Sequence, residues 1–147
     1  MKFIADGMLG KLARWLRMLG HDVIYWVQFD GSEFLELVKR EQRVLLTKDL
    51  QLYKRAIRKG MDSFYVEGKA ESERLAEVAK RYRLDLKIDV NKSNCPLCNT
   101  KLNQIPKEQI QSELEKTTFT YYLEFWKCPT AVKSIGKEHT GNKLIIY

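Results

Sequence analysis

The sequence predicts an α/β protein, with a three-layer α/β/α domain built on a mostly parallel sheet and a small β-rich unit after it. Short apolar runs alternate with helical patterns up to about Val90, which is typical of strands joined by crossover helices. One run, Arg43–Thr47, shows almost no polar alternation, so we expect both of its faces to be covered. After Asn91 the helical patterns stop and a Cys-X-X-Cys pair appears. We therefore assign residues 1–90 to the α/β domain and residues 91–147 to the second unit.

Strands and helices are expected to follow one another regularly in the first domain. The expected strands are Lys2–Asp6, Val23–Trp26, Arg43–Thr47 and Ser63–Val66. The expected helices cover Leu9–Leu19, a segment capped by Ser32, Leu50 to about Lys59, and Glu71–Tyr82. Gly20 is a natural stop for the first helix. In the second unit, "TTFTYYLEFWKC" (residues 117–128) is rich in β-forming residues and predicts strand.

Acidic residues stand where three of these strands end. Asp6 ends the first strand, Asp49 follows the third, and the loop after the second carries Asp30 and Glu33. Carboxylates that converge repel one another unless a cation lies among them, and oxygen ligands without histidine favour Mg²⁺ or Mn²⁺. Such an ion activates water and holds a phosphodiester. The alternative is a local role, as a cap or turn former for each aspartate and as a first-turn helix acid for Glu33.

The helix that follows Asp6 carries only positive charges. Lys11, Arg14 and Arg17 recur every three residues on the side away from the leucines, and Lys48 stands beside the acid of the third strand. A row of cations next to an acidic metal site suits a phosphate backbone, although a solvated helix face would show the same pattern. The net charge of +7 also suits a polyanion, but it is spread over both parts of the chain.

The three cysteines do not make a disulfide framework. Cys95 and Cys98 form a Cys-Pro-Leu-Cys knuckle, which is typical of a metal site in an intracellular protein. No apolar run reaches the roughly 18 residues that a membrane span needs, and the first residues lack the pattern of a signal peptide. We therefore expect a cytoplasmic protein without a membrane partner.

Four blocks of the sequence, in this order, resemble the Mut7-C family of PIN-like ribonucleases: "DGMLGKLARWLRMLGHD", an acidic loop, "RVLLTKD" and "CPLCN". The resemblance covers nearly the whole chain and implies a PIN-like α/β/α fold, metal-dependent cleavage of single-stranded RNA and a C-terminal zinc ribbon. By position, Asp6 and Asp49 match two metal-binding acids, and Asp30 matches the loop acid, with Glu33 as its substitute. The candidates for the fourth acid that such sites often hold are Glu67, Glu71 and Glu73.

The second half of the zinc ribbon departs from the family pattern. Cys95 and Cys98 form an intact first knuckle, and Cys128 opens the second, but Ala131 stands where the fourth cysteine is expected. His139 is a candidate for the fourth ligand. A structural zinc on these three cysteines and His139, and a unit that folds without zinc, both stay open.

The resemblance and the placement of the acids together predict a Mg²⁺- or Mn²⁺-dependent endoribonuclease acting on single-stranded RNA. Asp6, Asp30 and Asp49 would hold the ion, and the cations of the first helix would guide the RNA. The alternative is a non-catalytic protein that binds RNA or a ribosomal partner through the same basic surface. A toxin with an antitoxin partner would share the nuclease chemistry.

Overall fold

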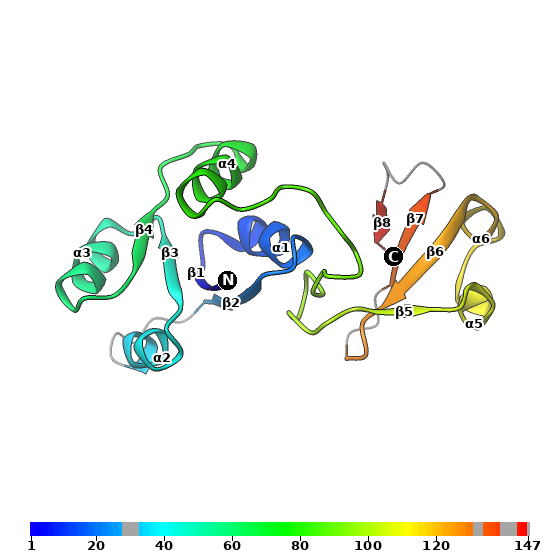
Figure 1. Ribbon diagram of the computed structural model, residues 1–147, viewed down its shortest axis with the longest axis horizontal. Coiled ribbons are helices and arrows are strands. Elements are labelled where there is room, and N and C mark those ends of the chain that lie inside the picture. Colours follow the sequence, from blue (N-terminus) through cyan, green and yellow to red (C-terminus); the bar gives the residue numbers. More distant parts are fainter. Residues whose placement is uncertain (28–32, 131–133, 139–143, 147) are drawn as a thin grey trace.

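Two sheets of different type organise the molecule, and the first confirms the predicted α/β class. The computed structural model describes residues 1–27, 33–130, 134–138 and 144–146. The first part contains β1 (Lys2–Asp6), α1 (Gly10–Met18), β2 (Asp22–Trp26), α2 (Glu33–Glu41), β3 (Val44–Thr47), α3 (Leu50–Arg58), β4 (Ser63–Tyr65) and α4 (Glu71–Tyr82). The second contains β5 (Asn103–Ile105), α5 (Lys107–Ile110), the 3₁₀ turn η1 (Gln111–Glu113), α6 (Lys116–Tyr121), β6 (Tyr122–Lys127), β7 (Ser134–Glu138) and β8 (Leu144–Ile146). Figure 1 shows the two sheets toward opposite ends of the molecule.

The first sheet is parallel and has the strand order β2-β1-β3-β4. The chain moves outward from β1 to β2 and then crosses back to place β3 on the other side of β1. The order therefore reverses between β1 and β3. In open parallel sheets a crevice that binds ligands forms beyond the carboxyl ends of the strands at this point. Asp6 is the last residue of β1 and Thr47 is the last residue of β3, so both stand at this crevice.

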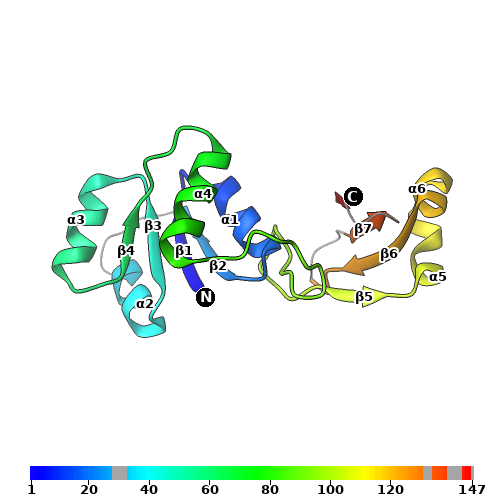
Figure 2. The same ribbon diagram turned by 45° about the horizontal axis from the view of Figure 1, so that its top comes forward.

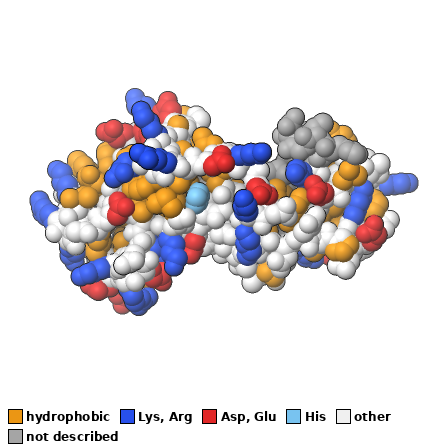
Figure 3. All heavy atoms as spheres, in the orientation of Figure 1, with side chains coloured by type: hydrophobic (Ala, Val, Ile, Leu, Met, Phe, Trp, Pro, Cys, Tyr) orange, Lys and Arg blue, Asp and Glu red, His pale blue; other side chains and the backbone are white. Residues whose placement is uncertain are grey.

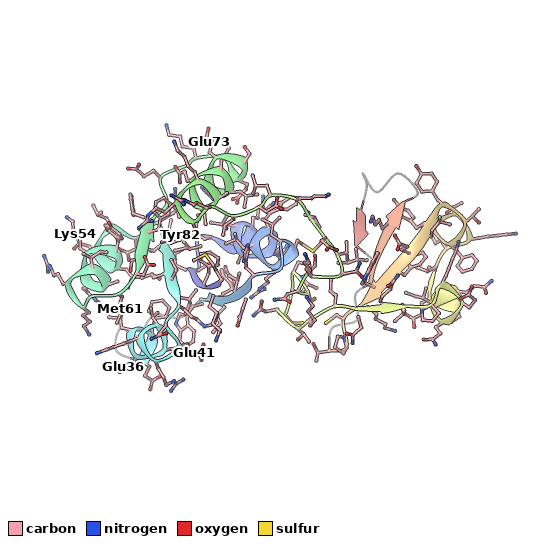
Figure 4. The ribbon with its side chains drawn as sticks, viewed as in Figure 1. Glu36, Glu41, Lys54, Met61, Glu73 and Tyr82 are labelled. Atoms are coloured by element: carbon pink, nitrogen blue, oxygen red, sulfur yellow. The ribbon has the colours of Figure 1, made fainter. Side chains whose placement is uncertain are left out.

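Helices cover both faces of the parallel sheet, which explains why its strands lack polar alternation. Phe3 and Ala5 of β1 pack in one apolar cluster with residues of α1 and α4, whereas Ile4 packs in another cluster with residues of α2 and α3. Tyr82 of α4 contacts Phe3 edge-on, with ring centroids 5.7 Å apart. Figure 4 shows Glu73 on α4 and Glu36 on α2 on opposite sides of the sheet. The domain thus has the three layers that the sequence predicts.

The second sheet is antiparallel, with the order β5-β6-β7-β8. One prediction for this part is wrong: residues 117–121 belong to helix α6 and only the following residues form strand β6. Two contacts involve this short helix. Thr120 donates its hydroxyl to the carbonyl of Lys116 (2.8 Å), and the ammonium group of Lys107 in α5 lies 4.3 Å from the centre of the Phe119 ring. These two contacts accompany a helical conformation that the local β propensity does not predict.

The segment around the cysteine knuckle joins the two parts by packing on the corner between α1 and β2, as Figure 2 shows. Asn99 covers the free edge of β2, since its Oδ1 accepts the N–H of Val23 (3.0 Å) and its Nδ2 donates to Asp22 (2.7 Å). Gly20, with a φ of +90°, directly follows the last turn of α1, where the sequence predicts the helix to stop. A Cβ at Gly20 would lie 2.8 Å from the carbonyl oxygen of Lys92, so glycine permits this close approach. The division of the chain at residue 90 stays a prediction.

Candidate active site at the edge of the parallel sheet

Asp6 is a buried carboxylate whose partners are neutral. Its side chain is 1% exposed at the end of β1. Oδ1 accepts the N–H of Met8 (3.0 Å), while Oδ2 accepts the N–H of Lys48 (2.8 Å) and the hydroxyl of Thr47. None of the ion pairs between residues that the structure describes involves Asp6. A buried negative charge is costly without a cation, so this position favours one.

Lys48 is adjacent to Asp6, but its ammonium group is directed elsewhere. Nζ donates to the carbonyl oxygens of Val66 (3.3 Å) and Gly68 (3.0 Å), which follow β4. Only the backbone N–H of Lys48 reaches the carboxylate of Asp6. The predicted RNA-contacting Lys48 therefore ties the ends of β3 and β4 together at the same edge of the sheet.

Asp49 is linked to Asp6 through Thr47. The Thr47 hydroxyl donates to Asp6 and accepts the N–H of Asp49 (2.9 Å). Asp49 also caps α3, because its Oδ1 accepts the N–H groups of Gln51 (2.9 Å) and Leu52 (3.1 Å). Its Oδ2 takes part in none of the hydrogen bonds between described residues. The predicted alternative of a helix cap is therefore correct for Oδ1 of Asp49. The carboxylate is exposed, and its Oδ2 is available to bind another group.

The third acid of the predicted set is not brought to this edge by the part of the chain that the structure describes. Asp30 lies outside the described residues. Glu33 is exposed at the start of α2, where it lines a shallow hollow with Trp26 and Arg40. Within residues 1–27, 33–130, 134–138 and 144–146, no three acidic side chains lie close enough to share one ion. Of the predicted acids, Asp6 and Asp49 are the two that the described residues bring to this edge, and both carry hard oxygen atoms of the kind that Mg²⁺ and Mn²⁺ prefer.

The three candidates for a fourth acid differ in their surroundings. Glu73 is exposed and accepts the N–H groups of Lys69 (2.9 Å) and Ala70 (3.3 Å), and these backbone hydrogen bonds lower the pKa of its carboxyl group. Glu67 is also exposed. Glu71, the first residue of α4, instead lines a cleft together with residues of α1. No sequence signal separated Glu71 from the other two acids.

The row of cations on α1 is divided by the fold. Lys11 and Arg14 are exposed, as predicted, whereas Arg17 is 7% exposed. The Arg17 guanidinium donates through Nε to the carbonyl of Val23 (2.9 Å) and through Nη1 to the carbonyls of Pro96 (2.8 Å) and Leu97 (3.2 Å). The expectation of an exposed Arg17 is corrected, because the cysteine knuckle packs on the end of α1 and uses these donors.

Comparison with known protein families shows which family the chain belongs to. A family model described as Mut7-C RNAse domain matches residues 1–134. The chain belongs to the Mut7-C RNAse domain family. No curated protein and no solved structure matches the chain. The match confirms the resemblance seen in the sequence and indicates an RNase-like function with RNA as the substrate. None of the helices in the described part of this Mut7-C chain has the length and apolar character to cross a membrane.

The cysteines of this Mut7-C chain form a second candidate metal site. The Sγ atoms of Cys95, Cys98 and Cys128 all lie within 4.8 Å of one another. Tetrahedral zinc with Zn–S bonds of about 2.3 Å places its sulfurs about 3.8 Å apart, so three sulfurs fit such an ion. Threonine hydroxyls surround the exposed Cys98, with Thr100 Oγ1 at 3.3 Å and Thr130 Oγ1 at 3.2 Å. The predicted fourth ligand, His139, lies outside the described residues, as does Ala131.

Two of the thiols, Cys95 and Cys98, differ in their pKa. Burial raises the pKa of Cys95 to about 11. Burial also acts to raise the pKa of Cys98, but the hydrogen bonds between its sulfur and the side chains of Thr100 and Thr130 outweigh burial, and the pKa is lowered to about 6. Cys98 therefore reaches the thiolate form needed for metal binding more readily than Cys95.

Proposed function

We propose that this Mut7-C chain is a Mg²⁺- or Mn²⁺-dependent endoribonuclease that hydrolyses single-stranded RNA. One observation supports this above all others. Asp6 is a 1% exposed carboxylate at the crevice between β1 and β3, and only neutral donors among the described residues satisfy it. The family match supplies RNA as the substrate class, and the carboxylate supplies a reason for a cation at the same edge.

Each residue of the site has a distinct role in the proposed reaction. Asp6 and Asp49 hold the ion, with Asp30 or Glu33 as the third acid. When bound, the ion polarises a water molecule and the scissile phosphate. Three hydrogen bonds fix the Asp6 carboxylate, so it is oriented before RNA arrives.

The exposed cations of α1 attract and position the RNA backbone. Lys11 and Arg14 are on the helix that starts four residues after Asp6, and neither takes part in an ion pair between described residues. Phosphate contacts of this kind position a polymer without reading its sequence. In the view of Figure 3, lysine and arginine side chains are spread over both parts of the molecule and lie among acidic side chains.

The proposal is tested by cleavage of an end-labelled single-stranded RNA with Mn²⁺, with Mg²⁺ and without added divalent ion. We expect cleavage only with a divalent ion, and a rate at least about a hundredfold lower for Asp6→Asn. Asp49→Asn is the sharper variant, because asparagine caps a helix as well as aspartate does but brings no charge to the ion. It should keep its stability and lose its activity.

Asp62→Asn is the matched control. Asp62 is an exposed acid directly before β4, so it lies at the amino ends of the parallel strands, whereas the proposed site lies at their carboxyl ends. Its replacement should leave cleavage unchanged. RNA binding without cleavage under every metal condition would contradict the proposal and identify a non-catalytic RNA-binding protein. Cleavage that survives both Asp6→Asn and Asp49→Asn would contradict the assignment of these residues.

A further inference from the structure

A cleft of about 400 Å³ lies between α1, β2, α4 and the cysteine knuckle. Its walls include Met8, Lys11, Arg14, Tyr25, Glu71 and Leu97. These residues come from four segments, and the knuckle contributes one wall, so the complete cleft exists only when both parts of the chain are folded together.

The cleft adjoins the acidic site. Met8 lines it and donates its backbone N–H to Oδ1 of Asp6 (3.0 Å). Tyr25 is fixed beside it, since its hydroxyl donates to the carbonyl of Gly7 (2.7 Å). Gly10 allows the ring to approach α1, because a Cβ at Gly10 would lie 3.2 Å from the Tyr25 oxygen. A molecule in the cleft would therefore lie against Met8, a residue that is hydrogen-bonded to the carboxylate of the proposed ion site.

The lining of the cleft combines cations with exposed apolar and aromatic groups. Lys11 and Arg14 provide two positive charges that suit phosphate. Met8, Tyr25 and Leu97 are 64%, 37% and 45% exposed and provide surfaces against which a flat ring can pack. Proteins that bind single-stranded nucleic acid pair positive groups for the backbone with such surfaces for the bases.

Glu71 places a carboxylate, which is a hydrogen-bond acceptor, in the lining of the cleft. A carboxylate does not help to bind phosphate, since both groups are negatively charged. Oε1 of Glu71 accepts a hydrogen bond from Nη1 of Arg74 (2.7 Å). Its Oε2 is buried and has no hydrogen-bond partner among the described residues. An unpaired buried acceptor is unfavourable, so a small shift of the half-buried Glu71 side chain that turns Oε2 into the cleft would be stabilised by a ligand that donates an N–H group there. A phosphate cannot do this, but the amino group of a nucleobase can.

We propose that the cleft is a subsite for one nucleotide of single-stranded RNA that selects a base with an exocyclic amino group. Lys11 and Arg14 bind the phosphate, Tyr25 and its apolar neighbours pack against the base, and Glu71 accepts the amino hydrogen. Cytosine is favoured over uracil, because uracil presents carbonyl oxygens on both sides of its single N–H and these repel a carboxylate. This inference rests on the proposed function in taking RNA as the ligand.

Binding of labelled oligocytidylate and oligouridylate to the full chain tests the subsite. The titrations contain neither added Mg²⁺ or Mn²⁺ nor a chelator, so that no cleavage is supported and any zinc in the knuckle is retained. We expect oligocytidylate to bind about tenfold more tightly, the factor that one hydrogen bond to a charged group supplies. Lys11→Gln should weaken the binding of both oligonucleotides equally and reduce its salt dependence.

Glu71→Gln is the decisive variant. The guanidinium of Arg74 keeps the amide oxygen of the new side chain, so the amide nitrogen takes the place of Oε2 and donates instead of accepting. The preference for cytosine should disappear or reverse toward uracil. Glu77→Gln, on the same helix, is the matched control and should keep the preference.

Each other result overturns the subsite. Equal binding of the two oligonucleotides by the wild type, or an unchanged preference in Glu71→Gln, would exclude base selection by Glu71. A Glu71→Gln variant that keeps its preference but loses Mn²⁺ binding would identify Glu71 as a ligand of the ion instead. The proposed function fails separately, through the absence of metal-dependent cleavage, whether or not cytosine is preferred.

Discussion

Replacement of Arg17 by lysine tests whether this residue joins the two parts of the chain or contacts RNA. The guanidinium of Arg17 donates to Val23 through Nε and to Pro96 and Leu97 through Nη1, at distances of 2.8–3.2 Å. The first hydrogen bond covers the free edge of β2, and the other two hold the backbone between Cys95 and Cys98. Lysine keeps the charge but offers a single nitrogen, so it cannot serve both groups at once.

The cost of this substitution follows from the hydrogen bonds that lysine cannot make. Hydrogen bonds that involve a charged group contribute about 1.5–3 kcal/mol each, and the regained hydration of the variant offsets part of this. The ammonium group can replace either the hydrogen bond to Val23 or the two that Nη1 makes, so lysine loses one or two of the three hydrogen bonds. We therefore expect the free energy of unfolding to fall by about 2–4 kcal/mol. The melting temperature should fall by roughly 5–12 °C.

Urea denaturation of Arg17→Lys measures the loss of stability, and hydrogen exchange locates it. The amide of Asn94, which donates to the carbonyl of Arg17 (2.9 Å), should exchange faster because the junction opens more often. Arg14→Lys is the matched control, since Arg14 is exposed on the same helix, and it should change stability by no more than about 0.5 kcal/mol. If Arg17→Lys were as stable as Arg14→Lys and lost only RNA affinity, the junction role would be refuted.

Three further predictions concern the corner, the edge of β2 and the cysteines. In urea denaturation, Gly20→Ala should lower the free energy of unfolding by at least about 1 kcal/mol, because alanine is strained at a φ of +90° and its Cβ would lie 2.8 Å from a backbone oxygen. Gly60→Ala is the control and should lower it less, because Gly60 has a φ of +73° with open space around it. Burial acts to raise the pKa of Asp22, but hydrogen bonds from Arg43 outweigh it and the pKa is lowered. The stability that Asp22 provides is therefore present at neutral pH and lost as the pH falls through its lowered pKa. The melting temperatures of wild type and Asp22→Asn should differ at pH 7 and converge in strong acid. A difference that stays constant with pH would contradict this. Zn²⁺ should raise the melting temperature of the reduced, metal-free chain, and Cys128→Ser should abolish that increase; an equal increase in the variant would exclude the cysteine site.

The parallel sheet was predictable because its burial pattern is visible in the sequence. Strands covered on both faces have no polar residues to interrupt them, and β1 and β3 show this in Phe3–Ala5 and Val44–Leu46. The glycine stop at Gly20 was predictable for a similar reason, since a helix end that needs positive φ favours glycine. The position of Asp6 at the crevice then followed from the rule for parallel sheets.

The roles of Arg17 and Glu71 could not be predicted from the sequence. The partners of Arg17 in the knuckle are backbone carbonyls about 80 residues away, and a backbone carbonyl leaves no signature in the residue type. Glu71 differs from Glu67 and Glu73 only through the three-dimensional arrangement of α1 and α4 around the cleft. Helix α6 was missed because its residues have weak helix propensity, and the contact of Phe119 with Lys107 of α5 is not visible in the local pattern.

Titration of the metal-free chain with Mn²⁺ tests the central claim most directly, because it asks whether Asp6 holds a cation. Free Mn²⁺ is followed by its electron paramagnetic resonance signal in wild type, Asp6→Asn and the control Asp62→Asn. Mn²⁺ prefers oxygen ligands, so the three thiols do not compete for it. We predict that wild type and Asp62→Asn bind Mn²⁺ and that Asp6→Asn, while folded, does not. Equal binding by Asp6→Asn and wild type would contradict the account.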